Sequence, residues 1–348
     1  MIPFMTGLTY FRFPLYPRAV MAVMVMLSLV ATATLPTTAY AQAQPVRRPE
    51  AVARAKEIAE KFKEAFNRFD SKDYKGTIQL CDELIAFRPD PYLYYLRALS
   101  FLELGKYEAA RDDAEQALRA FPSSPLGYLI SAVCYLHDRM YEKAWEALSK
   151  ADSLYTSTKN KTARLSRILA FALFCKGGDD NRVAELAEEA RATAKDSKDY
   201  LKSTYLLWSA RARQGKGGDI TGTIREAVDK EKQRLVEEAV GKGLDPDLSG
   251  DTPWNVSIGR FLLGDLTEGE LLKLAAESED AKVRASQMCE ACFYIAMCFI
   301  GEGEPAKAIP FLVRSVSTKS PTETLDMAIS QLQKLDPKNA ALDLVGGR

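Results

Sequence analysis

The stretch PYLYYLRALSFLELGKYEAARDDAEQALRAFP, from Pro91 to Pro122, decides the fold of this chain. Gly105 divides the stretch into two halves. The first half carries Ala98 and the second half Ala110, small residues that allow the backbones of two helices to approach each other closely. The pattern predicts two antiparallel helices, with the glycine leaving the first helix in a left-handed conformation. Pro122 ends the second helix and turns the chain toward the next element.

The same pattern begins again at Pro125, and an earlier copy starts near Ile58. Because one such helix pair cannot bury its own apolar face, neighbouring copies must stack. The recurring residues are Tyr94 with Tyr128, Ala98 with Ala132, Phe101 with Tyr135, Tyr107 with Tyr141, Ala110 with Ala144 and Ala117 with Ala151, and in the earlier copy Ala65, Tyr74 and Pro89.

This period and residue pattern resemble the tetratricopeptide repeat (TPR) family. That family places aromatic residues in the first helix, small residues where the two helices cross, and a proline at the end of the repeat. The resemblance implies an all-α fold, a right-handed solenoid of antiparallel helix pairs with a concave groove. We find no alternation of polar and apolar residues that would indicate a strand.

The repeat pattern and the loops between its copies divide the chain. Two regions after the clear repeats keep helix pairs but lose the family residues, and a Pro/Gly/Asp-rich loop precedes the last module. The predicted segments are a signal peptide (1–41), a linker (42–53), three TPR repeats (54–156), two degenerate helix-pair repeats (157–243), a loop (244–253) and a C-terminal TPR-like module with a capping helix (254–348).

The N-terminus has the composition of a secretory signal. Arg12 and Arg18 precede a short apolar stretch, Ala19 to Ala33, and Ala39-Tyr40-Ala41 offers a cleavage site. This predicts a periplasmic or secreted protein, with an uncleaved signal anchor as the open alternative. No cysteine follows the apolar stretch, so the sequence predicts no lipid anchor.

Composition disfavours several classes of function. Lys and Arg together number 47 and Asp and Glu 47, a balance unlike that of a nucleic-acid-binding protein. One histidine, His137, leaves almost no imidazole for a zinc site or for acid–base catalysis. We therefore predict no enzymatic activity, no catalytic residue, no metal, no cofactor and no small-molecule substrate.

The first helices of the three repeats supply the predicted binding groove. In TPR proteins, four positions of each first helix face the concave side, and here they are apolar or aromatic. Such a groove suits an amphipathic helix or an extended apolar segment of a protein partner. The alternative is that another helix of the chain, or of a dimer mate, fills it. The residues are Phe62, Phe66, Phe69, Tyr92, Tyr95, Leu99, Leu102, Leu126, Leu129, Val133 and Leu136.

A Cys-x-x-Cys pair, Cys289 and Cys292, supports a different class of function. It could serve as a redox pair in a thiol oxidoreductase, or the two cysteines could simply pack one helical turn apart. No second such pair exists and no histidine is near in sequence, so we favour packing. The loop Asp245 to Asp251 resembles a calcium loop, but Val256 stands where a glutamate ligand is needed.

The C-terminal part is similar to that of the bacterial periplasmic TPR lipoprotein NlpI and its relatives. The similarity runs from Trp254 through Phe261-Leu262-Leu263-Gly264-Asp265 to the helix Cys289 to Ala296. It implies an adaptor that dimerises, holds a periplasmic protease together with cell-wall hydrolases, and has no active site. We therefore predict an exported TPR scaffold, with a structural homo-oligomer whose groove is self-occupied as the alternative.

Overall fold

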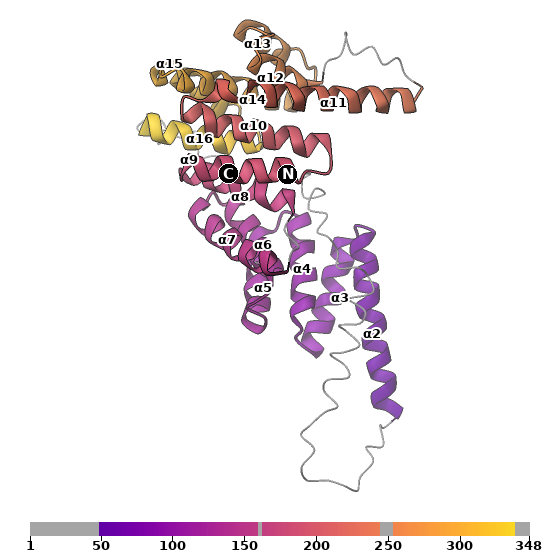
Figure 1. The fold of residues 1–348 in the computed structure, drawn as a ribbon. Coiled ribbons are helices and arrows are strands. Elements are labelled where there is room, and N and C mark those ends of the chain that lie inside the picture. Colours follow the sequence, from indigo (N-terminus) through magenta and orange to yellow (C-terminus); the bar gives the residue numbers. More distant parts are fainter. Residues whose placement is uncertain (1–48, 159–161, 244–252, 338–348) are drawn as a thin grey trace. The chain divides into compact units, whose positions relative to one another are not determined.

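The structure is a computed structural model that describes residues 49–158, 162–243 and 253–337. Within these ranges all regular elements are helical and no strand is present (Figure 1). The predicted signal peptide, most of the predicted linker and the loop 244–252 lie outside the described residues. The described residues form two compact units, unit 1 (49–134) and unit 2 (135–337).

Unit 1 consists of α2 (Pro49–Asp70), α3 (Tyr74–Phe87), α4 (Pro91–Glu103), α5 (Tyr107–Ala120) and most of α6 (Pro125–His137). Unit 2 contains the end of α6, α7 (Tyr141–Thr158), α8 (Ala163–Lys176), α9 (Asp180–Ala192), α10 (Ser197–Arg213), the short 3-10 helix η2 (Gly217–Ile220), α11 (Thr221–Gly241), α12 (Trp254–Leu262), α13 (Glu268–Ala276), α14 (Ala281–Gly301), α15 (Pro305–Ser317) and α16 (Glu323–Leu335). Consecutive helices pack as pairs, which confirms the predicted all-α solenoid.

One turn recurs at the end of the first helix of every pair. A residue with positive φ is followed by a backbone N–H that donates to the carbonyl five residues earlier, as in a Schellman motif. In the repeat that decides the fold, Gly105 has a φ of 71° and Lys106 N donates to Phe101 O at 2.8 Å. The other positive-φ residues in these turns are Lys72, Arg139, Gly177, Gly215, Gly264 and Gly303.

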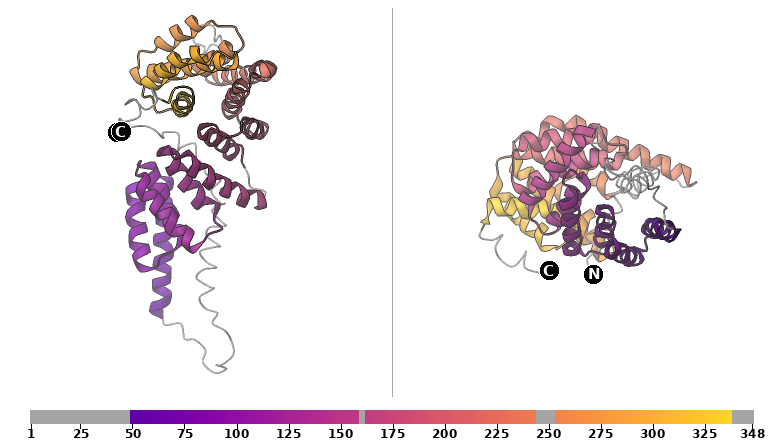
Figure 2. Two further views of the ribbon diagram at one scale, coloured as in Figure 1. Left: turned by 90° about the vertical axis from the view of Figure 1, so that its left-hand side faces the viewer. Right: turned by 90° about the horizontal axis from the view of Figure 1, so that it is seen from below.

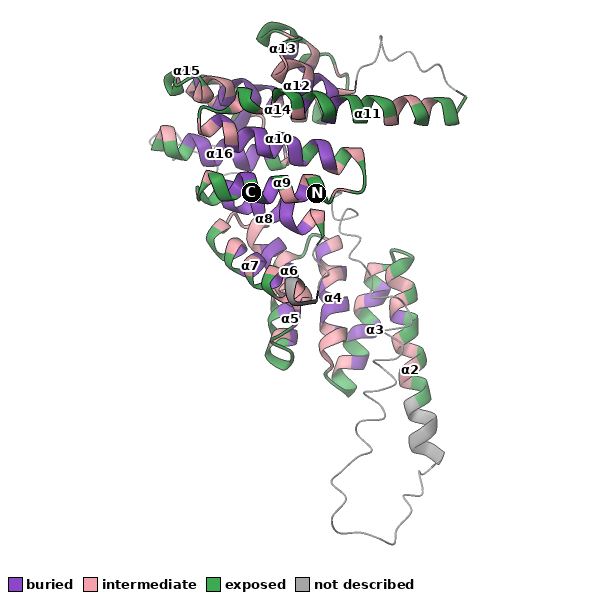
Figure 3. Cartoon of the chain, in the orientation of Figure 1, coloured by how far each residue is buried: buried purple, intermediate pink, exposed green. Residues whose placement is uncertain are grey.

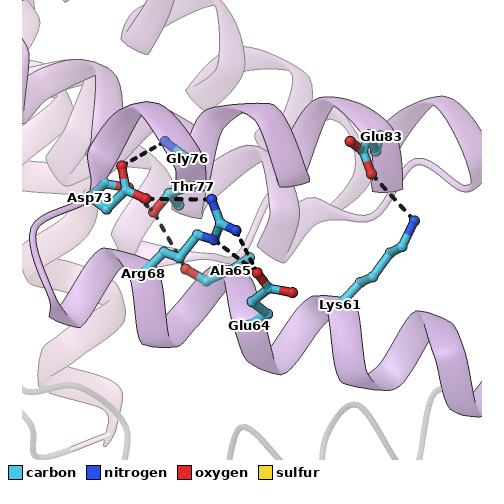
Figure 4. A network of polar contacts seen from close by, with 8 residues as sticks. All are labelled: Lys61, Glu64, Ala65, Arg68, Asp73, Gly76, Thr77 and Glu83. Atoms are coloured by element: carbon cyan, nitrogen blue, oxygen red, sulfur yellow. Dashed lines mark hydrogen bonds and ion pairs between the residues drawn. The ribbon is translucent and has the colours of Figure 1, made fainter.

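Polar contacts close the first pair, between α2 and α3 (Figure 4). Asp73 caps α3 by accepting from Gly76 N at 3.0 Å, and the Arg68 guanidinium lies 3.5 Å from the Asp73 carboxylate. A Cβ at Gly76 would come within 2.2 Å of that carboxylate, so a larger residue would disrupt the cap. Further along the pair, Lys61 Nζ lies 3.3 Å from Glu83 Oε2.

Unit 1 has a core of small and medium side chains. Ala98 of α4 and Ala110 of α5 are fully buried, which lets the two backbones approach closely as the sequence predicts. From α6, Ile130, Val133 and Cys134 complete this cluster. A neighbouring cluster holds Ala65, Leu80, Cys81, Leu84, Leu93 and Leu96.

Unit 2 has an inner layer formed by α8, α10 and α14, which contact one another in that order. The second helices of the pairs, α9, α11 and α15, pack on them, and α12 and α13 lie against α14. The last helix, α16, contacts α8 and α14 as well as α15, and the helices of the unit can be followed in Figure 2.

The helix α14 is long and apolar enough to cross a membrane by length and composition. In the structure it packs against α10, α12, α13, α15 and α16, and residues 291–297 are all buried (Figure 3). At its end, a Cβ on Gly301 would lie 3.2 Å from the carbonyl oxygen of Ala212 in α10. Burial in the core of unit 2 therefore accounts for its apolar composition.

Candidate functional site

The residues predicted to line the groove lie on the first helices α2, α4 and α6. Four of them, Tyr95, Leu102, Leu129 and Val133, are buried, with at most 7% of each exposed. Gly127 of α6 leaves space that Leu118 of α5 and the Tyr95 ring share, because a Cβ there would come within 2.6 Å of Leu118 Cγ and within 3.1 Å of the Tyr95 ring. These four side chains fill the core between repeats and are not available to a partner in this conformation.

The partly exposed members are the candidates for contact with a partner. Phe62 and Phe66 of α2 pack together, with ring centroids 5.3 Å apart, and both rest on the cluster beneath α2 and α4. Tyr92 and Leu99 of α4 and Leu126 of α6 rest in the same way on the cluster of α4, α5 and α6. We define Phe62, Phe66, Tyr92, Leu99 and Leu126 as the aromatic face of unit 1.

Two predicted residues are left out of this set, although Phe69 rests on the same cluster as Phe62 and Phe66. Phe69 packs edge-on against Tyr74 of α3, with ring centroids 5.6 Å apart, so part of its ring contacts its own repeat. Leu136 belongs to unit 2, and it is partly exposed.

The repeat register did not identify two more exposed rings. Phe87 ends α3 and Phe121 follows α5, and they are 49% and 43% exposed. They lie at the ends of the second helices of successive repeats, Phe87 as the last residue of α3 and Phe121 as the residue after α5, and each shortly precedes the proline that ends its repeat. A phenylalanine beside the proline that ends the repeat was the signal available in the sequence.

The cysteines are free thiols, and all except the half-buried Cys298 are buried. Cys289 Sγ lies 3.3 Å from Ser315 Oγ, and Cys292 Sγ lies 3.8 Å from Met288 Sδ. Burial raises the pKa of Cys292 to about 11, which disfavours the thiolate that redox chemistry requires. This environment is that of small packed side chains.

Two further polar residues, His137 and Asn255, have local partners. His137 Nδ1 lies 3.0 Å from the Asp138 carboxylate. Asn255, which begins a glycosylation sequon, donates to the buried Glu231 carboxylate at 3.0 Å. Within the described ranges, no group of three or more His, Cys, Asp or Glu side chains could hold a metal ion. The calcium-like loop Asp245 to Asp251 lies outside these ranges.

Residues 95–157 match the family model of the tetratricopeptide repeat. This confirms the TPR prediction for the stretch that includes most of α4, all of α5 and α6, and most of α7.

Two solved structures also resemble the chain. One is the C-terminal part of a TPR repeat-containing protein from Cytophaga hutchinsonii, at 16% identity and a TM-score of 0.42, covering 82% of this chain and 99% of that one. The other is Naa15/Naa10 bound to HypK-THB, at 14% identity and a TM-score of 0.31, covering 81% of this chain and 64% of that one. No curated protein sequence matches the chain.

Proposed function

We propose that this chain, which carries tetratricopeptide repeats, is an exported scaffold without catalytic activity that binds a protein partner on the aromatic face of unit 1. The observation that carries the proposal is the run of half-buried apolar side chains on consecutive first helices. Each rests on a core cluster, so its position is fixed while part of its surface stays open. Rigid aromatic anchors of this kind bind an amphipathic helix or an extended apolar segment at little entropic cost.

Site-specific photo-crosslinking tests this surface. A benzophenone amino acid replaces Phe66 or Leu99 in the full chain, and a control replaces Glu115, which is exposed on α5. We expect positions 66 and 99 to crosslink to the same partner in the native envelope, and position 115 not to. Equal crosslinking from position 115 would contradict the proposed face.

The alternative occupant is a second copy of the chain. If positions 66 and 99 crosslink only to another copy, and light scattering shows an oligomer that Phe66→Ser with Leu99→Ser dissociates, the structural homo-oligomer replaces the scaffold. If the double variant keeps its oligomeric state and its helicity but loses the heterologous crosslink, the scaffold is supported. By the resemblance to NlpI, we propose a periplasmic protease or a cell-wall hydrolase as the partner.

Export is proposed from the signal sequence alone. Cleavage after Ala41 would give a mature protein that begins at Gln42. We expect N-terminal sequencing of the protein from the envelope fraction to read from Gln42. A full-length N-terminus in that fraction would indicate the uncleaved anchor, and recovery from the cytoplasm alone would overturn export.

A further inference from the structure

The middle of helix α16 is buried on all sides, whereas Glu323 at its start and Lys334 near its end are exposed. Nine consecutive residues, Thr324 to Leu332, are buried, whereas a surface helix buries only one stripe. It contacts α8 and α14, which lie on either side of α10 in the inner layer, and Figure 3 shows its middle turns buried. The chain's last described helix therefore lies on the inner surface of unit 2.

Two ion pairs hold the first turns of α16. Glu323 Oε2 accepts from Arg167 Nη1 of α8 at 2.7 Å, and Asp326 Oδ1 accepts from Arg139 Nε, in the turn before α7, at 2.8 Å. Asp326 is only 3% exposed and Arg167 only 9%. Acidic residues at a helix N-terminus also interact favourably with the helix dipole, so both the position and the direction of α16 are specified.

The contact resembles a binding interface more than an apolar core. The buried run of α16 includes four polar residues, Thr324, Asp326, Ser330 and Gln331, whereas the buried run of α14 from Ala291 to Met297 is apolar apart from the Tyr294 hydroxyl. Interfaces between separable parts of a protein are more polar than continuous cores.

Some polar groups in the contact between α16 and its neighbours form hydrogen bonds, and others do not. Ser330 Oγ donates to Cys175 O at 2.7 Å, but Gln331 Nε2 and Arg167 Nε are buried without a hydrogen-bond partner. Buried donors without partners weaken the net stabilisation of the docked helix.

We propose that α16 is an intramolecular ligand, and that α8, α14 and α15, the helices it contacts, form a helix-binding surface which it keeps closed. The surface recognises a helix with two acidic residues three positions apart in its first turn, followed by apolar residues spaced as Leu325, Ile329 and Leu332. A partner helix with this pattern competes with α16 for the surface. The proposal concerns unit 2 alone and does not depend on the aromatic face of unit 1.

The experiment uses the full chain and a fluorescent peptide of residues 320–337. In one variant, Glu323→Arg and Asp326→Arg reverse the two charges that hold α16. A matched variant, Glu237→Arg with Glu277→Arg, makes the same charge change at two exposed positions of unit 2. Fluorescence anisotropy measures peptide binding, and hydrogen exchange with mass spectrometry follows α16, α8 and α14.

We expect the unaltered chain and the matched variant to bind the peptide at least tenfold more weakly than the Glu323/Asp326 variant. In that variant, exchange of the amides from 324 to 332 rises while those from 291 to 297 stay protected. A peptide that itself carries the two reversals binds at least tenfold more weakly than the native peptide.

Three results would overturn the proposal. If α14 and α8 lose protection together with α16, the helix is part of the core. If α16 stays protected in the variant, the two ion pairs do not hold it. If α16 is released but the peptide does not bind, the inner surface is not a helix-binding site.

Discussion

The Arg97 side chain joins three helices of unit 1. Its Nη2 and Nε atoms lie 2.6 and 2.8 Å from the two oxygens of Asp113 on α5, and its Nη1 contacts Asp82 on α3. Asp113 is 4% exposed, so its charge depends on this one guanidinium. The planar fork of arginine matches both carboxylate oxygens, which the single ammonium of lysine cannot do.

We predict that Arg97→Ala lowers the free energy of unfolding of unit 1 by about 3 kcal/mol, because the buried Asp113 carboxylate loses its partner. Arg97→Lys should cost about 1–2 kcal/mol, since one of the paired hydrogen bonds is lost. Urea unfolding followed by far-UV circular dichroism measures both. The control is the double variant Arg97→Leu with Asp113→Leu, which should recover most of the lost free energy of unfolding. If Arg97→Ala and the double variant destabilise unit 1 equally, the ion pair is not responsible for the effect.

At the residue scale, the sequence predicted on which helix each groove residue lies, but it did not predict how deeply each side chain is buried. The repeat register placed the predicted groove residues on the first helices, but it could not show that Tyr95 is buried. Its surroundings include Gly127 of the next repeat, where the missing side chain leaves room for Leu118 and for the Tyr95 ring. Packing between repeats, and not the position within one repeat, decides which apolar side chains remain exposed.

At the element scale, the turn within each helix pair recurs even in the part of the chain where the side-chain pattern of the TPR family is no longer recognisable. In the turns that join the two helices of each pair, the positive-φ residues Lys72, Gly105 and Arg139 follow one another at nearly equal intervals, and each later interval between such turns, up to Gly303, is longer. The residues typical of the TPR family become rare where the spacing between these turns lengthens. The stretch that matches the family model, 95–157, ends in the same region. The helix pairs were predictable because Gly marks most of these turns, but no sequence signal showed that α16 would lie inside unit 2.

A buried carboxylate joins three elements of unit 2. Glu231 of α11 is 1% exposed and accepts from Ser197 Oγ of α10 at 2.5 Å, from Asn255 Nδ2 of α12 at 3.0 Å and from Arg234 Nε at 3.0 Å. Burial alone would raise the pKa of Glu231, but the hydrogen bonds from Arg234, Ser197 and Asn255 lower it below the ordinary 4.5. The ionised form is therefore the one that stabilises the junction of α10, α11 and α12.

We predict that Glu231→Gln destabilises unit 2 by about 1–3 kcal/mol at neutral pH. Because the folded-state pKa of Glu231 lies below its unfolded value, its contribution is complete above the unfolded pKa and is lost as the pH falls through the folded one. Urea unfolding followed by tryptophan fluorescence should thus show the difference between the two proteins shrinking below pH 4.5. A difference that stays constant with acidification would mean that the charge of Glu231 is not what stabilises the junction.

At the scale of the whole molecule, the chain divides into two compact units, each with its own buried core. In repeat proteins, stability is roughly a sum over repeats and their nearest neighbours, so an array of repeats need not unfold in a single step. The three tryptophans, Trp145, Trp208 and Trp254, all belong to unit 2. Tryptophan fluorescence therefore reports on unit 2 alone, whereas circular dichroism reports on both units.

We predict that the two signals give different urea transitions for the same protein, because each unit unfolds on its own. Arg97→Ala should shift the circular dichroism curve and leave the fluorescence curve in place, since Arg97 contacts only helices of unit 1. Glu231→Gln should shift the fluorescence curve. Coincident transitions that move together in both variants would instead show one cooperative array, in which the stability of each unit depends on the other.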